Sequence, residues 1–500
     1  MKSLHPSAIA SALARISSVF WTSQPGEEIP GSSPGLVSAP VESAAVGHSV
    51  KRSISRSLIA ALAEGAVAEV FAACATGAVI TGWALFLGAS PAVIGFLGAL
   101  PLAAQVASLP AAWFMSGHSR KLVTVSAVSL SRLFFCPLVA LPFLPAPTET
   151  KLSAFVFVVG MSTLFGVIGN NAWIAWMGDL VPSRIRGRFF GRRTIYVSVA
   201  GTLASLGAAL VLDRASAASR TGPALAVLTG VGTLAGIISI ALLLSQQEPP
   251  AFGEQASAGW STLRTVLDDF HLRPLLTYQI CWNAAVAISA SFFAYHLLAN
   301  LRTGFLIVAC HGITVAAVRI ASAALWGRAV DTIGARPVLV LCSFGISIVP
   351  SIWLFTTPER LWPIAIEATT AGFLWAGHGI AMTSLSIAIS PRLTRPLYMA
   401  ALASAGGIGF STASLLAGQL AAALPQHFVV AGQGWTAIHV LFVLSAIGRF
   451  AAAVLSLRLQ DPRARGGVPE LVRMLRHRAR ALVPLGSSLR QAPECRGRLV

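Results

Sequence analysis

Three glutamates lie well inside long apolar stretches of this 500-residue chain, and one arginine lies near the middle of another. Glu64 and Glu69 lie in the first stretch, Arg132 in the third and Glu367 in the tenth. An ionisable side chain inside hydrocarbon is costly unless it faces a partner or a polar cavity, so each is a candidate functional group. The carboxyl groups could carry a proton or bind a cationic solute, and Arg132 could pair with an acid or bind an anion.

Helical spacing predicts which of these side chains share a face. Glu367 and His378 are eleven residues apart, so on a helix they point within about 20° of each other, roughly 16 Å apart along the axis. Glu64 and Glu69 point in different directions, so one of them is expected to face a cavity while the other packs elsewhere. A hydrogen-bonded structural role between helices is the competing interpretation for each of these groups.

Further polar and aromatic residues accompany these charges in the fourth, seventh and tenth apolar stretches. Gln279 and Asn283 are four residues apart and line one stripe of a helix. The remaining candidates for a substrate or proton pathway are Asn170, Asn171 and Trp375.

The composition requires a membrane to surround these residues. Hydrophobic residues make up 55% of the chain, charged residues 11%, and the formal net charge is +18. Soluble proteins contain about 25% charged residues. The six cysteines have no CxxC spacing, which argues against a disulfide scaffold or a zinc site. Without a phosphate-binding loop motif, a soluble nucleotide hydrolase is excluded, and nucleic-acid binding is a poor explanation of the basic charge.

A membrane-spanning helix needs roughly 20 mostly apolar residues. The continuous apolar runs lack the alternation of barrel strands, so they predict helices. They fall at about 58–86, 91–114, 121–143, 152–177, 194–212, 223–245, 275–299, 304–326, 337–356, 361–387, 397–424 and 435–457. The sequence therefore predicts an all-α integral membrane protein with twelve transmembrane helices.

The placement of lysine and arginine predicts the orientation of these helices. With the N-terminus inside, about 28 of the 36 basic residues fall in cytoplasmic segments. Both termini are therefore expected in the cytoplasm, with the chain in the inner membrane of a bacterium. The expected organisation is an unstructured tail (1–55), a six-helix bundle (56–245), a cytoplasmic linker (246–274), a second six-helix bundle (275–457) and a basic tail (458–500). Within that tail, residues 468–482 predict either a basic amphipathic helix on the inner leaflet or a solvated segment.

An internal repeat supports the division into two halves. Proline, arginine four residues later and an aromatic residue seven later occur at Pro182, Arg186 and Phe189, after the fourth span. The same spacing recurs after the tenth span, at Pro391, Arg395 and Tyr398.

Two loop motifs resemble those of the major facilitator superfamily of secondary transporters. Residues 327–336 match its G-x-x-x-D-x-x-G-x-R signature, and Asp179 with Arg186 matches its acid-x6-R-G signature. In the first half, the corresponding loop keeps only its basic end, at Arg120. The resemblance covers roughly residues 56–458 and assigns no subfamily.

This resemblance implies two pseudo-symmetric six-helix bundles that rock about a central site lined by the first, fourth, seventh and tenth spans. All three intramembrane glutamates fall in these four spans. The resemblance also implies that charged and glycine residues at the cytoplasmic face form a gate, although the arginines could simply be topological anchors. The gate candidates are Asp179, Arg184, Arg186, Gly187, Gly327, Asp331, Gly334, Arg336, Arg120 and Arg395.

The expected function is secondary active transport of a small solute by alternating access, powered by a proton or solute gradient. Within transport, export of amphipathic drugs and import of a sugar, peptide or organic anion both remain open. A receptor or a membrane assembly factor of the same architecture is the alternative from another class. The expected partners are the solute, a coupling proton and the lipid bilayer, with a monomeric chain and no enzyme activity, cofactor or metal ion.

Overall fold

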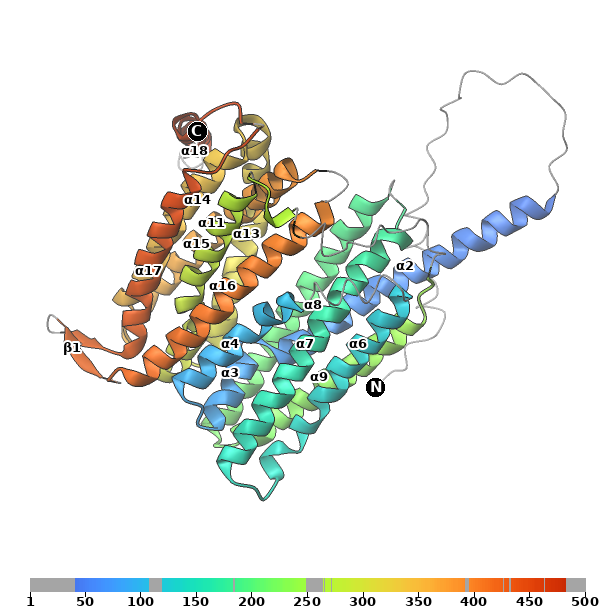
Figure 1. Ribbon diagram of the computed structural model, residues 1–500. Helices are drawn as coiled ribbons and strands as arrows, with labels where there is room; N and C mark the ends of the chain where they lie inside the picture. The colour runs from blue at the N-terminus through green and yellow to red at the C-terminus, as the bar shows by residue number, and fades with distance from the viewer. Residues whose placement is uncertain are drawn as a thin grey trace, which may run out of the picture. The chain divides into compact units, whose positions relative to one another are not determined.

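The computed structural model of the chain describes residues 41–107, 119–182, 185–248, 264, 266–270, 272–391, 395–425, 427–430, 433–462 and 464–482. Side chains are described from residue 55 to residue 476 within these ranges, apart from a few positions. Almost all of this part of the chain is helical (Figure 1). Continuous apolar sequence favours helices because a helix satisfies its backbone hydrogen bonds internally, without water.

The helices group into two compact units along the chain. Among the described residues, unit 1 holds those from 41 to 248 together with 297–309, and unit 2 holds those from 264 to 296 and from 310 to 482. The helices of unit 1 are α2 (Val41–Ala75), α3 (Gly77–Phe86), α4 (Pro91–Val106), α6 (Arg120–Phe135), α7 (Thr148–Leu180), α8 (Arg186–Ala217) and α9 (Thr221–Leu244). Two short 3-10 turns, Cys136–Val139 and Leu141–Phe143, extend α6.

Unit 2 has the same kind of construction, with a small hairpin added before its last long helix. The hairpin pairs Phe428 with Trp435 and Val430 with Gln433 in antiparallel register. The elements of this second half are α11 (Arg273–Ala290), α12 (Phe293–Tyr295), a π-helical turn (His296–Asn300), α13 (Phe305–Ile333), α14 (Ala335–Ile352), a 3-10 turn (Trp353–Phe355), α15 (Trp362–Ile389), α16 (Arg395–Ala423), β1 (Phe428–Val430), β2 (Gln433–Trp435), α17 (Ala437–Ser456) and α18 (Val468–Leu482).

The predicted spans agree closely with these helices. Within the described residues, 11 helical segments are long and apolar enough to cross a membrane. The second predicted span, 91–114, corresponds to α4, which is followed as far as Val106 and is shorter than the other apolar helices. Large apolar side chains also cover the outside, and Leu203, Val227 and Ile320 are each more than 60% exposed. Such a surface suits contact with lipid.

The first spans of both halves are interrupted, which the continuous apolar pattern did not predict. Between α2 and α3, Gly77 takes a left-handed conformation (φ +58°), which glycine adopts without strain. Just before it, the Thr76 hydroxyl donates to the Ala72 carbonyl at 2.8 Å, a local bond that competes with helix continuation. In the seventh span, α11 gives way to a turn, α12 and the π-helical turn.

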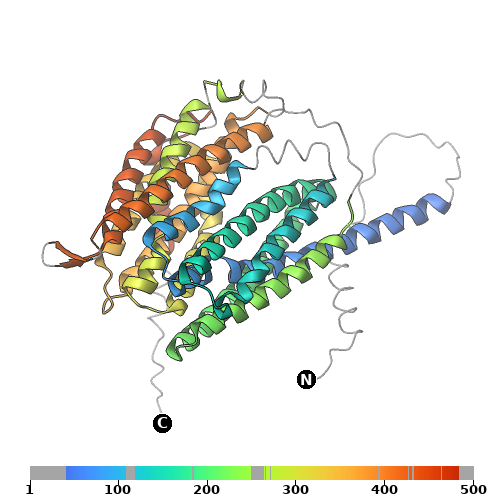
Figure 2. The same ribbon diagram turned by 60° about the horizontal axis from the view of Figure 1, so that its bottom comes forward.

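The domain boundaries differ from expectation at the N-terminus. Helix α2 begins at Val41, whereas an unstructured tail was expected as far as residue 55. Figure 2 shows the first turns of α2 extending beyond the other helices of unit 1. Most of the expected linker lies outside the described residues, and α11 begins within it at Arg273.

Candidate functional site

Unit 1 contains a buried cluster of charged side chains around Glu64. The Glu64 carboxylate is 5% exposed and accepts a hydrogen bond from the Ser239 hydroxyl of α9 at 3.0 Å. Arg193, on α8, forms an ion pair with its other oxygen at 3.5 Å. Arg132, on α6, is close enough to interact electrostatically with Glu64. Four helices of unit 1 thus contribute to one polar cluster inside the membrane span.

Both arginines of this cluster also lie over aromatic rings. The guanidinium carbon of Arg193 is 4.0 Å from the centre of the Trp173 ring, and that of Arg132 is 3.7 Å from the centre of the Phe71 ring. Cation–π contacts of this kind gain strength where water is excluded. Gly65 makes room for Arg193, because a Cβ atom at that position would lie 2.9 Å from the guanidinium.

Glu69, five residues after Glu64 on α2, lies against α8. A Cβ atom on Gly201 of α8 would come within 2.7 Å of the Glu69 Cγ atom, so this glycine allows the carboxylate to lie against α8. Arg193 interacts electrostatically with Glu69 as well as with Glu64. The sequence reasoning missed Arg193 because it assigned the basic start of α8 to the cytoplasmic face. Its position two turns inside the helix was the available signal.

Unit 2 contains a second cluster, centred on Glu367. Its carboxylate lies 2.5 Å from the Nε2 atom of His311, on α13, and the side chains are 5% and 18% exposed. Arg449, on α17, is 2% exposed and interacts electrostatically with Glu367. Its guanidinium donates to the Ser289 hydroxyl of α11 at 2.9 Å. The cluster therefore joins a carboxylate, an imidazole and a guanidinium inside the apolar span.

Two residues of this cluster were not among the candidates named from the sequence. Arg449 points into unit 2, where the Ser289 hydroxyl and the Glu367 charge hold it. His311 is the direct partner of Glu367. Sequence spacing relates residues within one helix, whereas His311 and Arg449 come from different helices.

His378, which shares a face with Glu367, has a different environment. Its Nε2 atom lies 2.9 Å from the Tyr278 hydroxyl, and its ring stacks on Trp282 with centroids 4.7 Å apart. Trp375 meets the same imidazole at 5.3 Å in an edge-on arrangement. These contacts give His378 and Trp375 a packing environment in the core of unit 2.

The predicted amides do not all join these clusters. Asn283 donates to the Gln279 carbonyl one turn earlier at 2.8 Å, and its amide approaches Gly406 of α16. Asn171 lies 3.5 Å from the Gln105 side chain of α4, and Asn170 is exposed. Gln279 and Asn283 therefore lie where α11 packs against α16.

The repeated loop motif has the same local geometry in both halves. Arg186 donates to the carbonyl of Val181, five residues earlier, at 3.3 Å. Arg395 donates to the carbonyl of Ser390, also five residues earlier, at 3.4 Å. Arg186 also bonds the Gly178 carbonyl at 2.7 Å, so it satisfies backbone groups at the end of α7. Arg184 lies outside the described residues, and of Gly187 only the backbone is described.

A second repeat, which sequence reasoning did not find, joins the start of one helix to the end of another in each half. In unit 1, Lys121 at the start of α6 donates to the Leu244 carbonyl at 2.8 Å. Four residues after Leu244, the Glu248 carboxylate accepts from the Lys121 amide at 3.1 Å. This acid thus satisfies one amide at the start of α6, beside the Ser119 hydroxyl, which accepts from the Leu122 amide at 3.0 Å. In the same region, Arg120 forms an ion pair with Asp179.

Unit 2 repeats this arrangement at the Gly327–Arg336 motif. Arg336 donates to the Leu457 carbonyl at 2.7 Å, and four residues later the Asp461 carboxylate accepts from the Ala335 and Arg336 amides at 2.8 and 3.1 Å. Asp331, one of the gate candidates, is exposed, and Asp461 holds the capping position at the start of α14.

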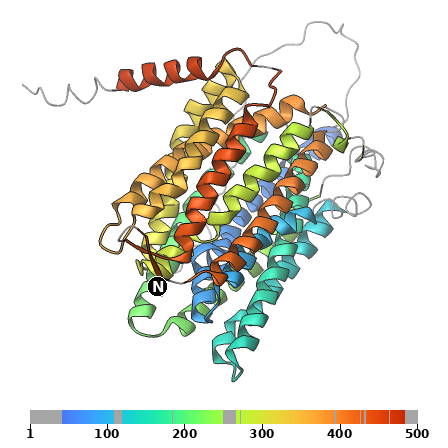
Figure 3. The same cartoon turned by 60° about the vertical axis from the view of Figure 1, so that its left-hand side comes forward.

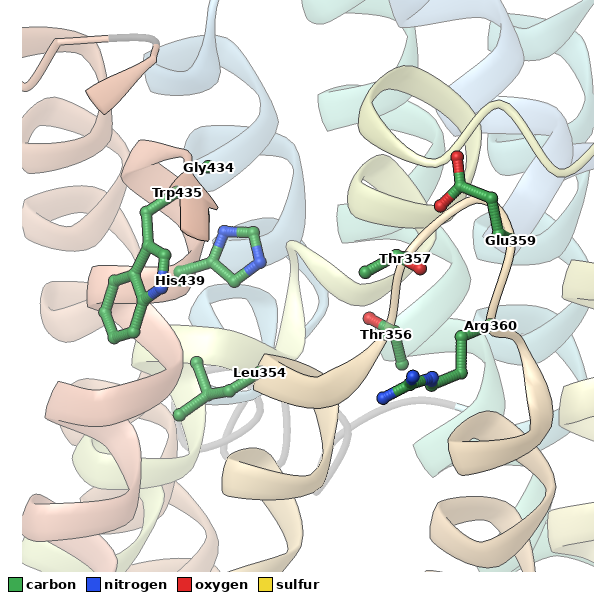
Figure 4. Close-up of a pocket in the computed structure, with 8 residues that line it drawn as sticks. All are labelled: Leu354, Thr356, Thr357, Glu359, Arg360, Gly434, Trp435 and His439. Atoms are coloured by element: carbon green, nitrogen blue, oxygen red, sulfur yellow. The ribbon is translucent and has the colours of Figure 1, made fainter. Parts of the chain in front are cut away.

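A polar pocket of about 510 Å³ lies where the turn between α14 and α15 meets the β-hairpin (Figure 4). In Figure 4, Trp435 and His439 lie on one side of it, and Glu359 and Arg360 lie on the other. The His439 Nδ1 atom accepts from the Thr436 amide at 3.0 Å, so the neutral ring carries its proton on Nε2. No group of three or more potential metal ligands occurs among the described residues.

Comparison with solved structures places this architecture among known transporters. The chain is similar to a D-xylose–proton symporter, with a TM-score of 0.63, 14% identity, and coverage of 83% of this chain and 100% of the other. The chain has the major facilitator superfamily fold. A nucleoside transporter, NupG, matches with a TM-score of 0.60, 13% identity, and coverage of 81% and 99%.

A bacterial homologue of the human lysosomal transporter Spinster shares the major facilitator fold with this chain as well. It matches with a TM-score of 0.55 and 17% identity over 82% of this chain and 99% of the other. Neither protein-family models nor curated protein sequences match the chain. At these identities the similarity establishes the fold of a multi-pass membrane protein, and the chemistry must be argued from its own residues.

Proposed function

We propose that this protein is a proton-coupled secondary transporter of a small solute in the inner membrane, with both termini in the cytoplasm. The observation that carries the proposal is the His311–Glu367 pair, at 2.5 Å, beside the buried Arg449. Histidine exchanges protons near neutral pH more readily than any other side chain. Ionisable groups within membrane spans are typical of proton and substrate pathways.

The geometry of the pair explains how it would couple a proton to a conformational change. The imidazole and the carboxylate can hold one shared proton or two, so loading changes the charge of the site by one unit. In a low-dielectric interior such a change alters the attraction to Arg449. Because the three side chains come from α13, α15 and α17, their attraction affects the packing of three helices.

The carboxylates of unit 1 support a role for that unit in binding. Arg193 lies near both Glu64 and Glu69, so a solute that displaced one interaction would change the other. Glu64 is fully engaged by Ser239 and Arg193, whereas Glu69 is only partly buried. We therefore assign Glu69 as the carboxylate that binds the polar group of the solute.

Transport in proteoliposomes tests the proposal. Purified chain is reconstituted, a pH gradient is imposed, and a library of sugars, nucleosides, peptides and organic anions is screened for uptake with simultaneous recording of internal pH. The expected result is solute accumulation accompanied by proton movement. In Glu367→Gln and His311→Gln, accumulation should fall at least tenfold while exchange of internal for external solute continues.

His378→Gln is the matched control, because it removes a buried histidine from unit 2 without touching the Glu367 cluster. It should retain the ratio of protons to solute even if it lowers the amount of folded protein. Solute flux without proton movement in the wild-type chain would overturn the coupling. A folded chain that moved no member of the library would instead favour the receptor or assembly-factor function.

A further inference from the structure

Helix α18, which follows the last membrane span, is docked on unit 2 through one face. Leu471 is completely buried and belongs to the same core cluster as Val338 and Leu339 of α14. Met474 and Leu475 pack against this cluster and are partly buried. Figure 3 shows α18 projecting sideways from the end of the long helices of unit 2. The apolar side of α18 is therefore covered by the core of unit 2.

The segment that leads into α18 is bound to both ends of the loop between α13 and α14. The Arg465 and Gly466 amides donate to the Ile333 carbonyl at 2.8 and 3.1 Å, at the end of α13. Asp461 caps the start of α14. Between them, Gly334 takes a φ of +124°, and a Cβ atom there would lie 2.8 Å from the Ala464 Cα atom. We call residues 457–462 and 464–467 the clasp.

The opposite side of α18 is basic. Arg473 and Arg476 are exposed, and helical spacing places both on the side away from Leu471. The only acid in the helix, Glu470, pairs with one of these arginines, because its carboxylate accepts from the Gly467 amide at 2.8 Å and from Arg473 at 2.6 Å. The sequence of α18 contains four arginines and this one glutamate, so the helix keeps a net positive charge after that pair is counted.

We propose that this basic side binds the headgroups of anionic phospholipids in the leaflet next to the clasp. The proposal rests on the orientation given above, which makes this the cytoplasmic leaflet. Anionic headgroups attract basic side chains held within a Debye length of the membrane surface. Leu471 packs against α14 near the end of the span, so the docked helix is held at the membrane interface. A soluble acidic partner would not require the basic side to lie at the membrane interface.

Lipid binding at this site has a consequence for the loop between α13 and α14. A headgroup that holds Arg473 and Arg476 also holds the docked helix, and the clasp is continuous with that helix. The hydrogen bonds from the clasp to Ile333 and to the start of α14 are then stabilised. Anionic lipid is therefore a ligand that favours the arrangement in which this cytoplasmic end is closed by the clasp.

Lipid binding to the full-length chain in neutral detergent tests the proposal. Short-chain phosphatidylglycerol and phosphatidylcholine are titrated separately, and bound lipid is counted by native mass spectrometry. The wild-type chain should prefer phosphatidylglycerol. Each arginine near such a surface contributes roughly fivefold in affinity, so Arg473→Gln with Arg476→Gln should weaken binding by roughly 25-fold. Inorganic phosphate at the same concentration should not compete.

The matched control removes two exposed arginines elsewhere, by Arg214→Gln with Arg220→Gln. This variant should keep the phosphatidylglycerol affinity. Equal losses in the two double variants, or equal affinity for both lipids, would overturn the proposal. Tighter binding of an acidic peptide or of RNA than of phosphatidylglycerol at physiological salt would overturn it too. None of these measurements uses transport, so their failure is distinct from failure of the proposed transport function.

A third variant tests the mechanical connection. Leu471→Ser keeps the basic charges but removes the buried anchor of α18. Phosphatidylglycerol should slow deuterium uptake in the clasp of the wild-type chain and should lose this effect in Leu471→Ser. Protection of the clasp that persisted in Leu471→Ser would show that the docked helix does not transmit lipid binding.

Discussion

Arg193 shows what one buried charge requires of its surroundings. Its guanidinium has an acid within reach, an aromatic ring beneath it and a glycine that leaves space for it. Each contact comes from a different place in the sequence. A buried charge of this kind is stable only as part of its network, because removing one partner leaves the other charge unpaired.

A double-mutant cycle on Glu64 and Arg193 should show strong coupling. Glu64→Gln and Arg193→Gln are each expected to reduce the free energy of unfolding by about 2–3 kcal/mol, since each leaves a buried charge without its partner. The double variant should lose less than the sum of the two. Thermal unfolding of purified protein measures these effects, and additive losses would contradict the pairing.

Element packing depends on positions where helices approach closely. Gly377 of α15 is such a position, because a Cβ atom there would lie 2.5 Å from the Cys342 Sγ atom and 2.7 Å from Trp326. In contrast, among the described residues no neighbouring atom lies within 4 Å of the position that a Cβ atom on Gly230 of α9 would take. Close packing therefore requires a glycine at position 377, whereas no neighbouring atom in the described part of the chain requires one at position 230.

Substitution by alanine should distinguish the two glycines. Gly377→Ala is expected to destabilise unit 2 by about 1–3 kcal/mol through overpacking. Gly230→Ala should be neutral or stabilising by up to about 1 kcal/mol, because alanine lowers the entropy of the unfolded chain. Apparent melting temperatures of the two variants provide the comparison. Equal changes in melting temperature would show that the close approach of α14 and α15 does not limit the stability of unit 2.

The two capping acids predict parallel local effects in the two halves. Glu248→Ala should free the Lys121 amide at the start of α6, and Asp461→Ala should free the first amides of α14. Loss of such a cap costs about 1 kcal/mol, so deuterium uptake at these helix starts should rise roughly fivefold. Glu359→Ala, at an exposed turn, is the control and should change neither. Unchanged uptake at the start of α14 in Asp461→Ala would contradict the assigned cap.

The start of α18 should respond to pH. The Gly467 amide and Arg473 hold the pKa of Glu470 below its ordinary value of 4.5. A depressed pKa contributes stability above pH 4.5 that is lost as the pH falls toward the folded-state value. Cleavage of α18 by pepsin, which is active at acidic pH, should therefore accelerate in the wild-type chain as the pH falls below about 4.5, beyond the change in pepsin's own activity. In Glu470→Gln the rate should already be high and should not show this step.

At the scale of the whole molecule, charge distribution predicts the orientation in the membrane. In intact cells, Lys151→Cys should react with a membrane-impermeant thiol reagent, whereas Arg458→Cys should react only after permeabilisation. Both variants are made in a background in which the native cysteines are replaced by serine. Labelling of Arg458→Cys in intact cells would reverse the proposed orientation.

The sequence predicted the helices well because hydrophobic length is a local property. Within the described residues, eleven of the twelve apolar runs matched helices long enough to cross a membrane, and the repeated Arg186 and Arg395 loops matched in their hydrogen bonds. It also identified Glu64, Glu69 and Glu367 as unusual, since a charge in an apolar run is visible without a structure. It missed the break at Gly77, because one left-handed glycine leaves the average hydropathy unchanged.

By itself, then, the sequence determined which segments are apolar enough to span a membrane and which charges lie within them. Only the tertiary structure decided that Glu367 pairs with His311 and not with His378. It also decided that Arg193 pairs with Glu64. At the start of α14, it showed that the capping acid is Asp461 and not Asp331. The physical reason is that hydrophobicity and helical spacing act along the chain. The partner of a buried charge is chosen by packing between helices, which brings together residues more than a hundred positions apart.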